Sequence, residues 1–208
     1  VHFYIKTLKN PNKILVIVQR SNGDVLLSLS LIKSLFEYFD HPKIDLLVND
    51  DTIQVAKIIP FVDHVYTFSY IKKQTNWIMQ EYNLISSLFR KYDLSVNLTA
   101  SDRSVIYALL ASKKSISAVE KDYKKSWWKK KLLNLHYYFD SSRHILLNNL
   151  EPLNLLNIKH ANVQDSIKVS SHAHKSIDRL IKKKGITEYI IFHPSAQYHY
   201  KIYPKHLR

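Results

Sequence analysis

Asp24 lies at a point in the sequence where a carboxylate could carry out chemistry. It follows an apolar run at residues 14–18 (ILVIV) and a polar turn at residues 19–23 (QRSNG), and a helical pattern begins directly after it. In open α/β sheets, ligands bind just beyond the carboxyl ends of the strands. A carboxylate placed there can act on a ligand as a general base. Asp is also favoured at helix N-caps, so capping is the alternative role, and both roles can hold at once.

Gly23 directly precedes Asp24 and is one of two glycines in 208 residues. An average chain contains about 7% glycine. This scarcity predicts a position that does not tolerate a side chain. Either the φ angle of Gly23 is positive, or another group approaches its backbone closely.

A second polar stretch lies near the other end of the chain. Residues 189–192 (YIIF) are predicted to form a buried strand. The stretch HPSAQYHYKIYP follows at residues 193–204 and contains Lys201. Taken alone, Lys201 is predicted to be a surface lysine, as most lysines are.

The pattern around these stretches predicts a parallel α/β sheet. Strands are predicted at residues 14–18, 43–48, 62–68, 92–98 and 116–119, and helical patterns separate them. Alternation of strands and helices is typical of parallel sheets.

The first helix is predicted to run without interruption over residues 25–39. Its solvent-facing side is predicted to carry Ser30, Lys33, Ser34 and Glu37.

Three further segments are predicted from local signals. Residues 69–75 are predicted to form a loop, and residues 143–150 a helix that ends before Pro152. Residues 153–171 are interpreted as the approach to an interdomain linker. A short helix after it is predicted to end at Gly185.

Composition restricts the class of protein and the kind of partner. The formal net charge of +14 and the pI of about 9.7 predict an anionic partner, which could be nucleic acid, a phospholipid surface or a phosphorylated ligand. The absence of cysteine excludes disulfides and suits the cytosol. No apolar stretch approaches the ~18 residues of a membrane span, and residues 1–12 show no signal-peptide pattern.

Residues 121–131, KDYKKSWWKKK, interleave lysines with Tyr123, Trp127 and Trp128. They are interpreted either as a solvated basic loop or as a loop that contacts an anionic bilayer, because Trp prefers the membrane interface. Binding of nucleic acid by stacking is a third alternative, but no nucleic-acid-binding motif accompanies it.

The stretch ILVIVQRSNGDVLLSLSLIKSL resembles the opening of the family 9 glycosyltransferases, the bacterial heptosyltransferases of lipopolysaccharide core assembly. These enzymes begin with an apolar strand, a polar turn that ends in Gly-Asp-Val, and a Leu-rich helix. Residues 193–204 resemble the family segment His-Pro-Gly-Ala-Ser followed by Lys-x-Trp-Pro. Here Ser195 replaces the Gly, Gln197 the Ser, and Tyr203 the Trp. The two motifs bracket most of the chain.

The resemblance implies a fold and a division of the chain. It implies a Rossmann-like parallel sheet similar to the N-terminal half of a GT-B glycosyltransferase. Residues 1–165 would form this acceptor-side domain, and residues 166–208 would form a linker and the start of the nucleotide-sugar-binding domain. The family segment Asp-Thr-Gly-x-x-His, which contacts the donor, has no counterpart here. We therefore expect that the 208-residue chain is inactive on its own.

The resemblance also implies an activity. Family members transfer heptose from a nucleotide sugar, here expected to be ADP-heptose, with inversion and without a metal or other cofactor. The acceptor would be a phosphorylated, lipid-linked saccharide, either lipid A–Kdo or the inner core. The site would lie in the cytoplasm, on the inner face of the bacterial inner membrane, and no nucleic acid would be bound.

The resemblance assigns roles residue by residue. Asp24 would be the catalytic base, and Lys201 would bind the donor phosphates together with Ser195 and Gln197. Trp127 and Trp128 would contact the membrane under the bilayer interpretation. Candidates for acceptor binding are Gly23, Arg20, Lys72, Lys73, Arg103 and Arg143.

Two other classes of protein are weighed against this one. A nicotinamide oxidoreductase would need a G-x-G-x-x-G motif after the first strand, and the sequence lacks it. A non-catalytic basic module that binds lipopolysaccharide, anionic membrane or nucleic acid remains the alternative.

Overall fold

The computed structural model describes residues 10–163, 167, 169–193, 196 and 202–207. The chain divides into two compact units, Val1–Lys168 and Val169–Arg208. All strands of the described residues lie in the first unit. The functional division at residue 165 stays a prediction.

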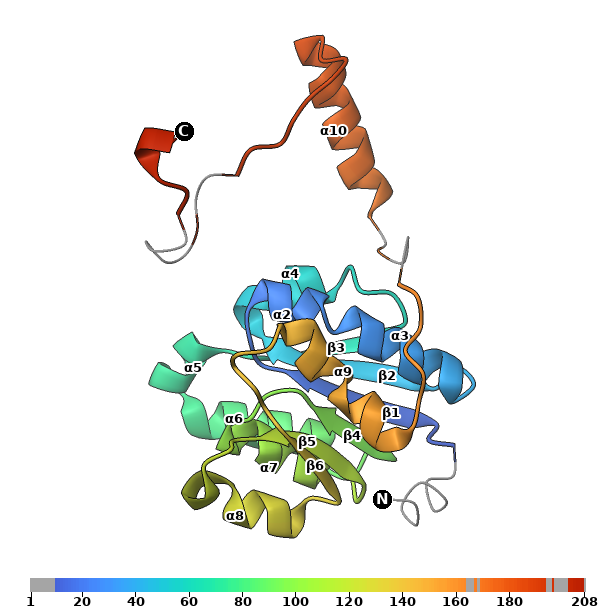
Figure 1. Ribbon diagram of the computed structural model, residues 1–208, viewed down its shortest axis with the longest axis vertical. Coiled ribbons are helices and arrows are strands. Elements are labelled where there is room, and N and C mark those ends of the chain that lie inside the picture. Colours follow the sequence, from blue (N-terminus) through green and yellow to red (C-terminus); the bar gives the residue numbers. More distant parts are fainter. Residues whose placement is uncertain (1–9, 164–166, 168, 194–195, 197–201, 208) are drawn as a thin grey trace. The chain divides into compact units, whose positions relative to one another are not determined.

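The first unit is built on one six-stranded sheet (Figure 1). Every neighbouring pair of strands is parallel, and their order is β3-β2-β1-β4-β5-β6. The predicted parallel α/β fold is therefore confirmed. The strands are β1 (Lys13–Val18), β2 (Lys43–Asn49), β3 (His64–Phe68), β4 (Leu94–Asn97), β5 (Ser115–Val119) and β6 (Leu135–Tyr138).

Helices connect these strands across both faces of the sheet. The connecting segments are α2 (Asn22–Leu26), α3 (Leu29–Tyr38), η1 (Asp50–Thr52), α4 (Ile53–Ala56), α5 (Tyr70–Thr75), α6 (Trp77–Leu88), α7 (Asp102–Ala111) and α8 (Tyr123–Leu132). Helix α9 (Ile145–Leu156) follows β6.

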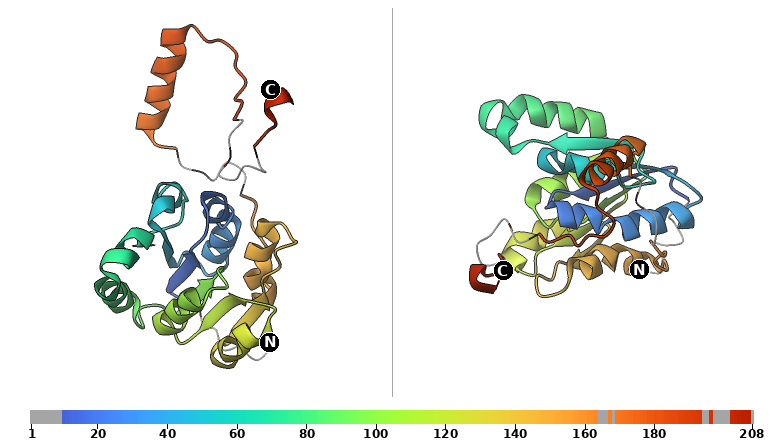
Figure 2. Two further views of the ribbon diagram at one scale, coloured as in Figure 1. Left: turned by 90° about the vertical axis from the view of Figure 1, so that its left-hand side faces the viewer. Right: turned by 90° about the horizontal axis from the view of Figure 1, so that it is seen from above.

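Alternation along the strands separates the core into two faces. On β1, Ile14, Val16 and Val18 face the cluster that contains α3 and α9 residues, whereas Leu15 and Ile17 face the cluster of α6 and α7. Figure 2 shows α3 and α9 on one side of the sheet and α6, α7 and α8 on the other. Because both faces are covered, β1 is apolar and buried from Ile14 to Val18, as is typical of central strands in parallel sheets.

The prediction of one continuous helix after β1 is wrong, because α2 and α3 are separated at Leu27 and Ser28. Ser30 and Ser34 are also buried rather than solvent-facing. The Ser34 hydroxyl donates to the Ser30 carbonyl at 2.6 Å and accepts from the Ala161 amide at 2.8 Å. The segment after α9 therefore covers the side of α3 that the pattern assigned to solvent.

Two predicted loops are helices. Residues 70–75 form α5, which begins where the Ser69 hydroxyl accepts a hydrogen bond from the Lys72 amide. Residues 123–132 form α8, and the Asp122 carboxylate accepts from the Lys124 amide at its start. In both segments a capping side chain starts the helix, and the charge run conceals the signal.

Helix α9 continues past Pro152 to Leu156, so the predicted helix end is wrong, and Arg143 precedes the helix. Leu153 and Leu156 are buried in the main core cluster. Packing of these side chains thus outweighs the hydrogen bond that a proline removes.

The second unit contains α10 (Ser171–Lys184), which ends at Gly185 with φ of +61°, as predicted. The prediction of a buried strand at residues 189–192 is wrong. These residues form no strand, and Ile190 is 95% exposed. The described part of this unit has no other strand with which they could pair.

Candidate active site

The Asp24 carboxylate lies just beyond the carboxyl end of β1, in the first turn of α2. Its Oδ2 atom accepts hydrogen bonds from the Arg20 Nε at 3.0 Å, the Ser21 hydroxyl at 3.0 Å and the Ser21 amide at 3.3 Å. Within the described residues Oδ1 accepts none. The side chain keeps 17% of its surface exposed. One oxygen thus fixes the carboxylate and the other is left for a ligand.

Asp24 contributes to capping of α2, but it is not the N-cap residue. Ser21 is the N-cap residue, and Asp24 is the third residue of α2, from where it reaches back to the Ser21 amide. This arrangement is the return half of a capping box. Because it occupies only Oδ2, it does not compete with a catalytic role for Oδ1.

The two predicted reasons for Gly23 are not found. Its φ angle is not in the left-handed region, and a Cβ atom added to it would meet no atom within 4 Å. Gly23 is exposed beside Asp24. Its missing side chain leaves open space next to the carboxylate.

Arg20 links Asp24 to the residue that follows β6, the edge strand of the sheet. Its guanidinium stacks on the Phe139 ring at 4.6 Å, and Phe139 directly follows β6. Burial raises the pKa of the neighbouring Tyr137, and the nearby Glu151 carboxylate raises it further, whereas Arg20 opposes the shift. Arg20 is therefore an anchor for both Asp24 and the β6–α9 connection.

Arg143 lies in this same connection. Its Nη1 donates to Glu151 Oε1 of α9 at 2.7 Å. Asn149 of α9 donates to the Asp24 carbonyl at 3.4 Å. Glu151 and Asn149 were not predicted, because no short-range spacing links Asn149 to Asp24 or Glu151 to Arg143. Strand β6 was not predicted either, although Leu135 and Tyr137 alternate with less buried residues there.

Arg103, Lys72 and Lys73 belong to a second group of cations. Arg103 stacks at 3.7 Å on Phe68, the last residue of β3, and donates to the Tyr70 hydroxyl at 3.0 Å. Tyr70 begins α5, which carries Lys72 and Lys73 on its exposed surface. All predicted acceptor-binding residues thus follow carboxyl ends of strands, which is the edge where ligands bind in such sheets.

Two buried amides at this edge were not predicted. Gln19 follows β1 and Asn49 ends β2, and both are more than nine-tenths buried. Neither amide atom of the Gln19 side chain, nor Asn49 Oδ1, has a hydrogen-bond partner in the part of the chain that the structure describes. Unsatisfied buried polar groups are rare in proteins and often accompany functional sites.

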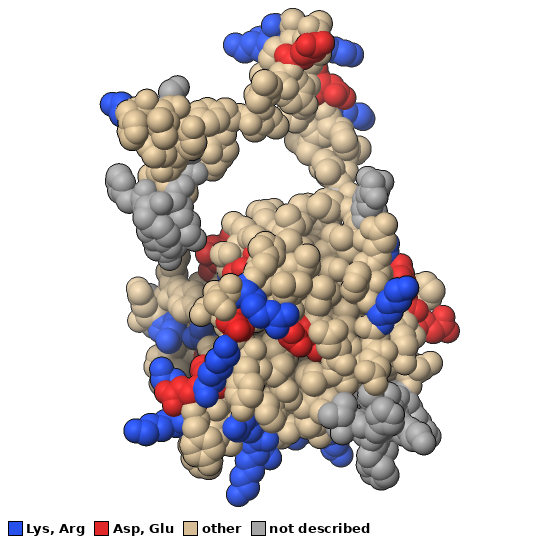
Figure 3. All heavy atoms as spheres, viewed as in Figure 1, with Lys and Arg blue, Asp and Glu red and all other residues tan. Residues whose placement is uncertain are grey.

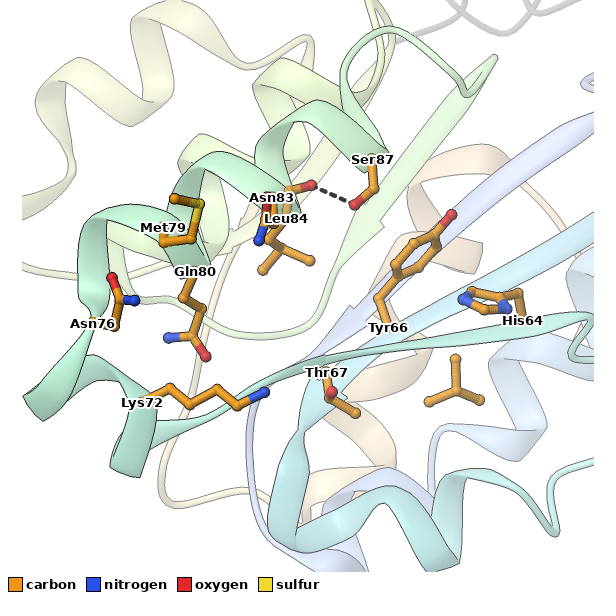
Figure 4. Close-up of a pocket in the computed structure, with 11 residues that line it drawn as sticks. His64, Tyr66, Thr67, Lys72, Asn76, Met79, Gln80, Asn83, Leu84 and Ser87 are labelled. Carbon is orange, nitrogen blue, oxygen red and sulfur yellow. Dashed lines mark hydrogen bonds between the residues drawn. The ribbon is translucent and has the colours of Figure 1, made fainter.

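A cavity of ≈ 570 Å³ lies between the edge strand β3 and the helices α5 and α6 (Figure 4). Its lining combines Lys72 and the amide side chains of Asn76, Gln80 and Asn83 with apolar side chains such as Met79 and Leu84. Asp24 is not among the lining residues. The cavity is therefore separate from the Asp24 site.

The two tryptophans of α8 differ in their surroundings. Trp127 is 51% exposed, whereas Trp128 packs against the core cluster of Val105, Val119 and Leu133. Lys129 is fully buried, and its ammonium contacts Glu120 at 2.7 Å and Asp102 at 2.6 Å. The sequence pattern did not distinguish Lys129 from the other lysines of residues 121–131.

Ser195, Gln197 and Lys201, the predicted donor-binding residues, lie outside the described residues. Among the residues that are described, no group of three or more His, Cys, Asp or Glu is arranged to hold a metal ion. None of the helices in the described part of the chain is long and apolar enough to span a membrane.

The chain is similar to curated glycosyltransferases. It is 27% identical over 188 residues to lipopolysaccharide heptosyltransferase 3 of Escherichia coli and, equally, to that of strain K12. The alignment covers 88% of this chain and 54% of each relative, so the chain spans about half the length of these relatives. No family model matches the sequence.

Solved structures share the fold. A family 9 glycosyl transferase from Veillonella parvula superposes with a TM-score of 0.76 at 17% identity, over 93% of this chain and 56% of that one. The E. coli heptosyltransferase WaaC with ADP-2-deoxy-2-fluoro heptose gives 0.58 at 17% identity, over 73% and 50%. E. coli heptosyltransferase II gives 0.56 at 16% identity, over 81% and 50%.

The parallel sheet, with the Asp24 site at its carboxyl edge, has the architecture of half of a GT-B glycosyltransferase. Together with the curated relatives, this fold confirms the resemblance to glycosyltransferase family 9 that the two sequence motifs predicted.

Proposed function

We propose that this chain is the acceptor-side half of a heptosyltransferase of lipopolysaccharide core assembly. The donor is ADP-heptose, the acceptor is a phosphorylated inner-core saccharide on lipid A, and transfer proceeds with inversion and without a metal. The observation that supports this proposal is the Asp24 carboxylate, which is held through Oδ2 while Oδ1 accepts no hydrogen bond from the described residues.

In this mechanism Asp24 Oδ1 accepts the proton of the attacking acceptor hydroxyl. The hydroxyl oxygen bonds to the anomeric carbon as the bond to the diphosphate breaks, and attack from the opposite side inverts the configuration. Arg20 and Ser21 hold the carboxylate in place throughout. The growing charge on the diphosphate requires a cation, and Lys201 is the candidate that the family resemblance supplies.

The acceptor phosphates are proposed to bind at the cations that follow β3, β4 and β6. Arg103, Lys72 and Lys73 form one group, and Arg143 lies beyond β6. Arg20 pairs with Asp24, so its first role is to position the base. Arg143 pairs with Glu151 and would exchange this partner for a phosphate.

Transfer is proposed to need a donor-binding half in addition to these residues, because the sequence has no counterpart of the family's Asp-Thr-Gly-x-x-His segment. The 208-residue chain by itself is then inactive and binds the acceptor but not ADP-heptose. The enzyme is proposed to work in the cytoplasm, at the inner face of the inner membrane, where α8 contacts anionic lipid through Trp127 and its lysines.

The test measures binding and transfer separately. The 208-residue chain is titrated with phosphorylated inner-core oligosaccharide, and transfer from ADP-heptose is assayed after the chain is joined to the second half of the E. coli relative. Asp24→Asn should keep acceptor binding and lower turnover by roughly 10²–10⁴. Asp40→Asn is the matched control, because this carboxylate is 90% exposed.

Binding of the oligosaccharide without transfer in any combination would favour the alternative of a non-catalytic basic module. If turnover in Asp24→Asn falls only in proportion to the loss of thermal stability, Asp24 acts as a helix-capping residue and not as the catalytic base. Absence of oligosaccharide binding would contradict the proposal as a whole.

A further inference from the structure

Helices α5 and α6 expose an unusual set of apolar side chains. Ile71, Trp77, Ile78, Met79 and Tyr82, called here the α5–α6 face, are each between 53% and 75% exposed. Single exposed apolar residues are normal on protein surfaces, but contiguous ones mark interaction surfaces. On α6, Ile78 and Met79 precede Tyr82 by four and three residues, a spacing that places these side chains beside one another, and Trp77 is exposed at the start of the same helix.

The face is not a consequence of a poorly packed helix. Leu84 and Leu88, on the side of α6 opposite Met79 and Tyr82, are buried in the core cluster that α6 and α7 form against the sheet. Gln80 fixes the start of α6, since its amide exchanges two hydrogen bonds with the Ser69 backbone, at 2.8 and 3.1 Å. Helix α6 therefore has an inner apolar side that is satisfied and an outer apolar side that is not.

The exposed charges that α5 and α6 place around the face are all positive. Lys72 and Lys73 are exposed on α5. The single carboxylate of the two helices, Glu81, is turned inward, where it accepts a hydrogen bond from the Tyr107 hydroxyl at 2.6 Å. Apolar and aromatic residues flanked by lysines, with no outward carboxylate, suit the headgroup region of an anionic bilayer.

A second surface of the same kind lies on the same side of the sheet. Helix α8 exposes Tyr123, Trp127 and Leu132 among its lysines. Figure 3 shows Lys and Arg side chains projecting from the lower margin of the first unit, the region where Figure 1 draws α8. Helix α7 packs between α6 and α8, so the three helices form one layer.

We propose that the α5–α6 face inserts into the interfacial region of an anionic phospholipid bilayer, so that α6, α7 and α8 lie toward the membrane. A second copy of the chain is disfavoured as the occupant, because the lysines beside the face would oppose one another across a two-fold axis. Insertion of Trp77 and its neighbours goes beyond the electrostatic contact of α8. It deepens the membrane contact of the proposed function but needs no donor or acceptor.

The experiment follows Trp77 directly. Trp127→Phe combined with Trp128→Phe leaves Trp77 as the single tryptophan of the chain. This variant is mixed with vesicles of phosphatidylethanolamine and phosphatidylglycerol whose acyl chains carry bromine. Trp77 emission should shift to the blue and be quenched. Vesicles of phosphatidylcholine alone should give little quenching, because the lysines find no net negative charge there.

A matched pair of substitutions distinguishes insertion of the α5–α6 face from nonspecific hydrophobic adsorption to the vesicles. Ile78→Ser on the α5–α6 face should lower the vesicle partition coefficient at least about tenfold. Leu147→Ser removes a comparably exposed apolar side chain from α9, on the other side of the sheet, and should leave it unchanged. Circular dichroism of each variant verifies the fold.

Two results would overturn the proposal. One is unquenched Trp77 in a protein that nonetheless sediments with the vesicles. The other is a doubled mass in light scattering that Ile78→Ser abolishes, which would assign the face to a second copy. Because these measurements contain no sugar nucleotide and no acceptor, they fail or succeed independently of the transfer assay.

Discussion

At the scale of single residues, the Asp24 site depends on which of the two carboxylate oxygens accepts the hydrogen bonds from Arg20 and Ser21. Asp24 could be placed from sequence, because a strand, a polar turn and a helix locate it at the sheet edge. The sequence could not predict that Oδ2 accepts these hydrogen bonds and Oδ1 does not, since this follows from the geometry of the Arg20 and Ser21 side chains. Asn149, which donates to the Asp24 carbonyl, lies more than 120 residues from Asp24 along the chain. A single sequence gives no contact signal over such a separation.

Lys129 provides a test of buried charge. It has no exposed surface and pairs with Glu120 and Asp102. Lys129→Ala should lower the free energy of unfolding by about 2–5 kcal/mol, because it removes a fully buried side chain and leaves a cavity. The measurement is urea unfolding followed by circular dichroism. Lys130→Ala is the matched control, and an equal loss in both variants would contradict the buried pair.

Asp140 provides a test of pH dependence. Hydrogen bonds from Ser142 and from Lys121 lower the pKa of its carboxyl from 3.8 to about 2. A lowered pKa in the folded state contributes stability above pH 3.8, and this contribution is lost as the pH falls through about 2. The urea midpoint of wild type should therefore exceed that of Asp140→Asn at pH 6 and converge with it near pH 2. A constant difference over this range would show that Asp140 acts without its charge.

At the scale of elements, hydrophobic runs predicted better than charge runs. The strands at residues 14–18, 43–48 and 116–119 are rich in apolar residues and were found at the expected places. Residues 69–75 and 121–131 were interpreted as loops because lysines dominate them, yet Ser69 and Asp122 cap helices there. Helix α8 buries Ser126 and Lys129, and residues 70–74 of α5 are exposed, so no apolar stripe reveals the helical period in either segment.

The two tryptophans of α8 should respond differently to substitution. Trp127→Ala removes an exposed side chain and should weaken sedimentation with anionic liposomes, more so as salt rises to about 0.5 M. Trp128→Ala removes a side chain packed in the core and should mainly lower the melting temperature. Unchanged liposome binding in Trp127→Ala would return α8 to the interpretation of a solvated basic surface.

At the scale of the whole molecule, the alternation of strands and helices was sufficient to predict the parallel sheet, but not the end of the apolar region. Residues 189–192 have the composition of a buried strand, yet Tyr189, Ile190, Ile191 and Phe192 are all more than 60% exposed. A strand is stable only with partners that satisfy its backbone groups. Composition gives the propensity of a segment, whereas burial depends on neighbours that the segment does not encode.

The first unit should therefore fold by itself. Its six strands and all three core clusters lie within residues 13–163, so the cooperative core is complete there. A chain that ends at residue 168 should unfold within a few degrees of the 208-residue protein in thermal circular dichroism, because exposed segments contribute little to cooperative stability. Limited proteolysis of the longer protein should cut first around residues 185–193, where large apolar side chains are exposed and no strand pairs the backbone. A melting temperature lowered by ten degrees or so in the shorter chain would mean that residues 169–208 support the sheet through contacts that form in solution.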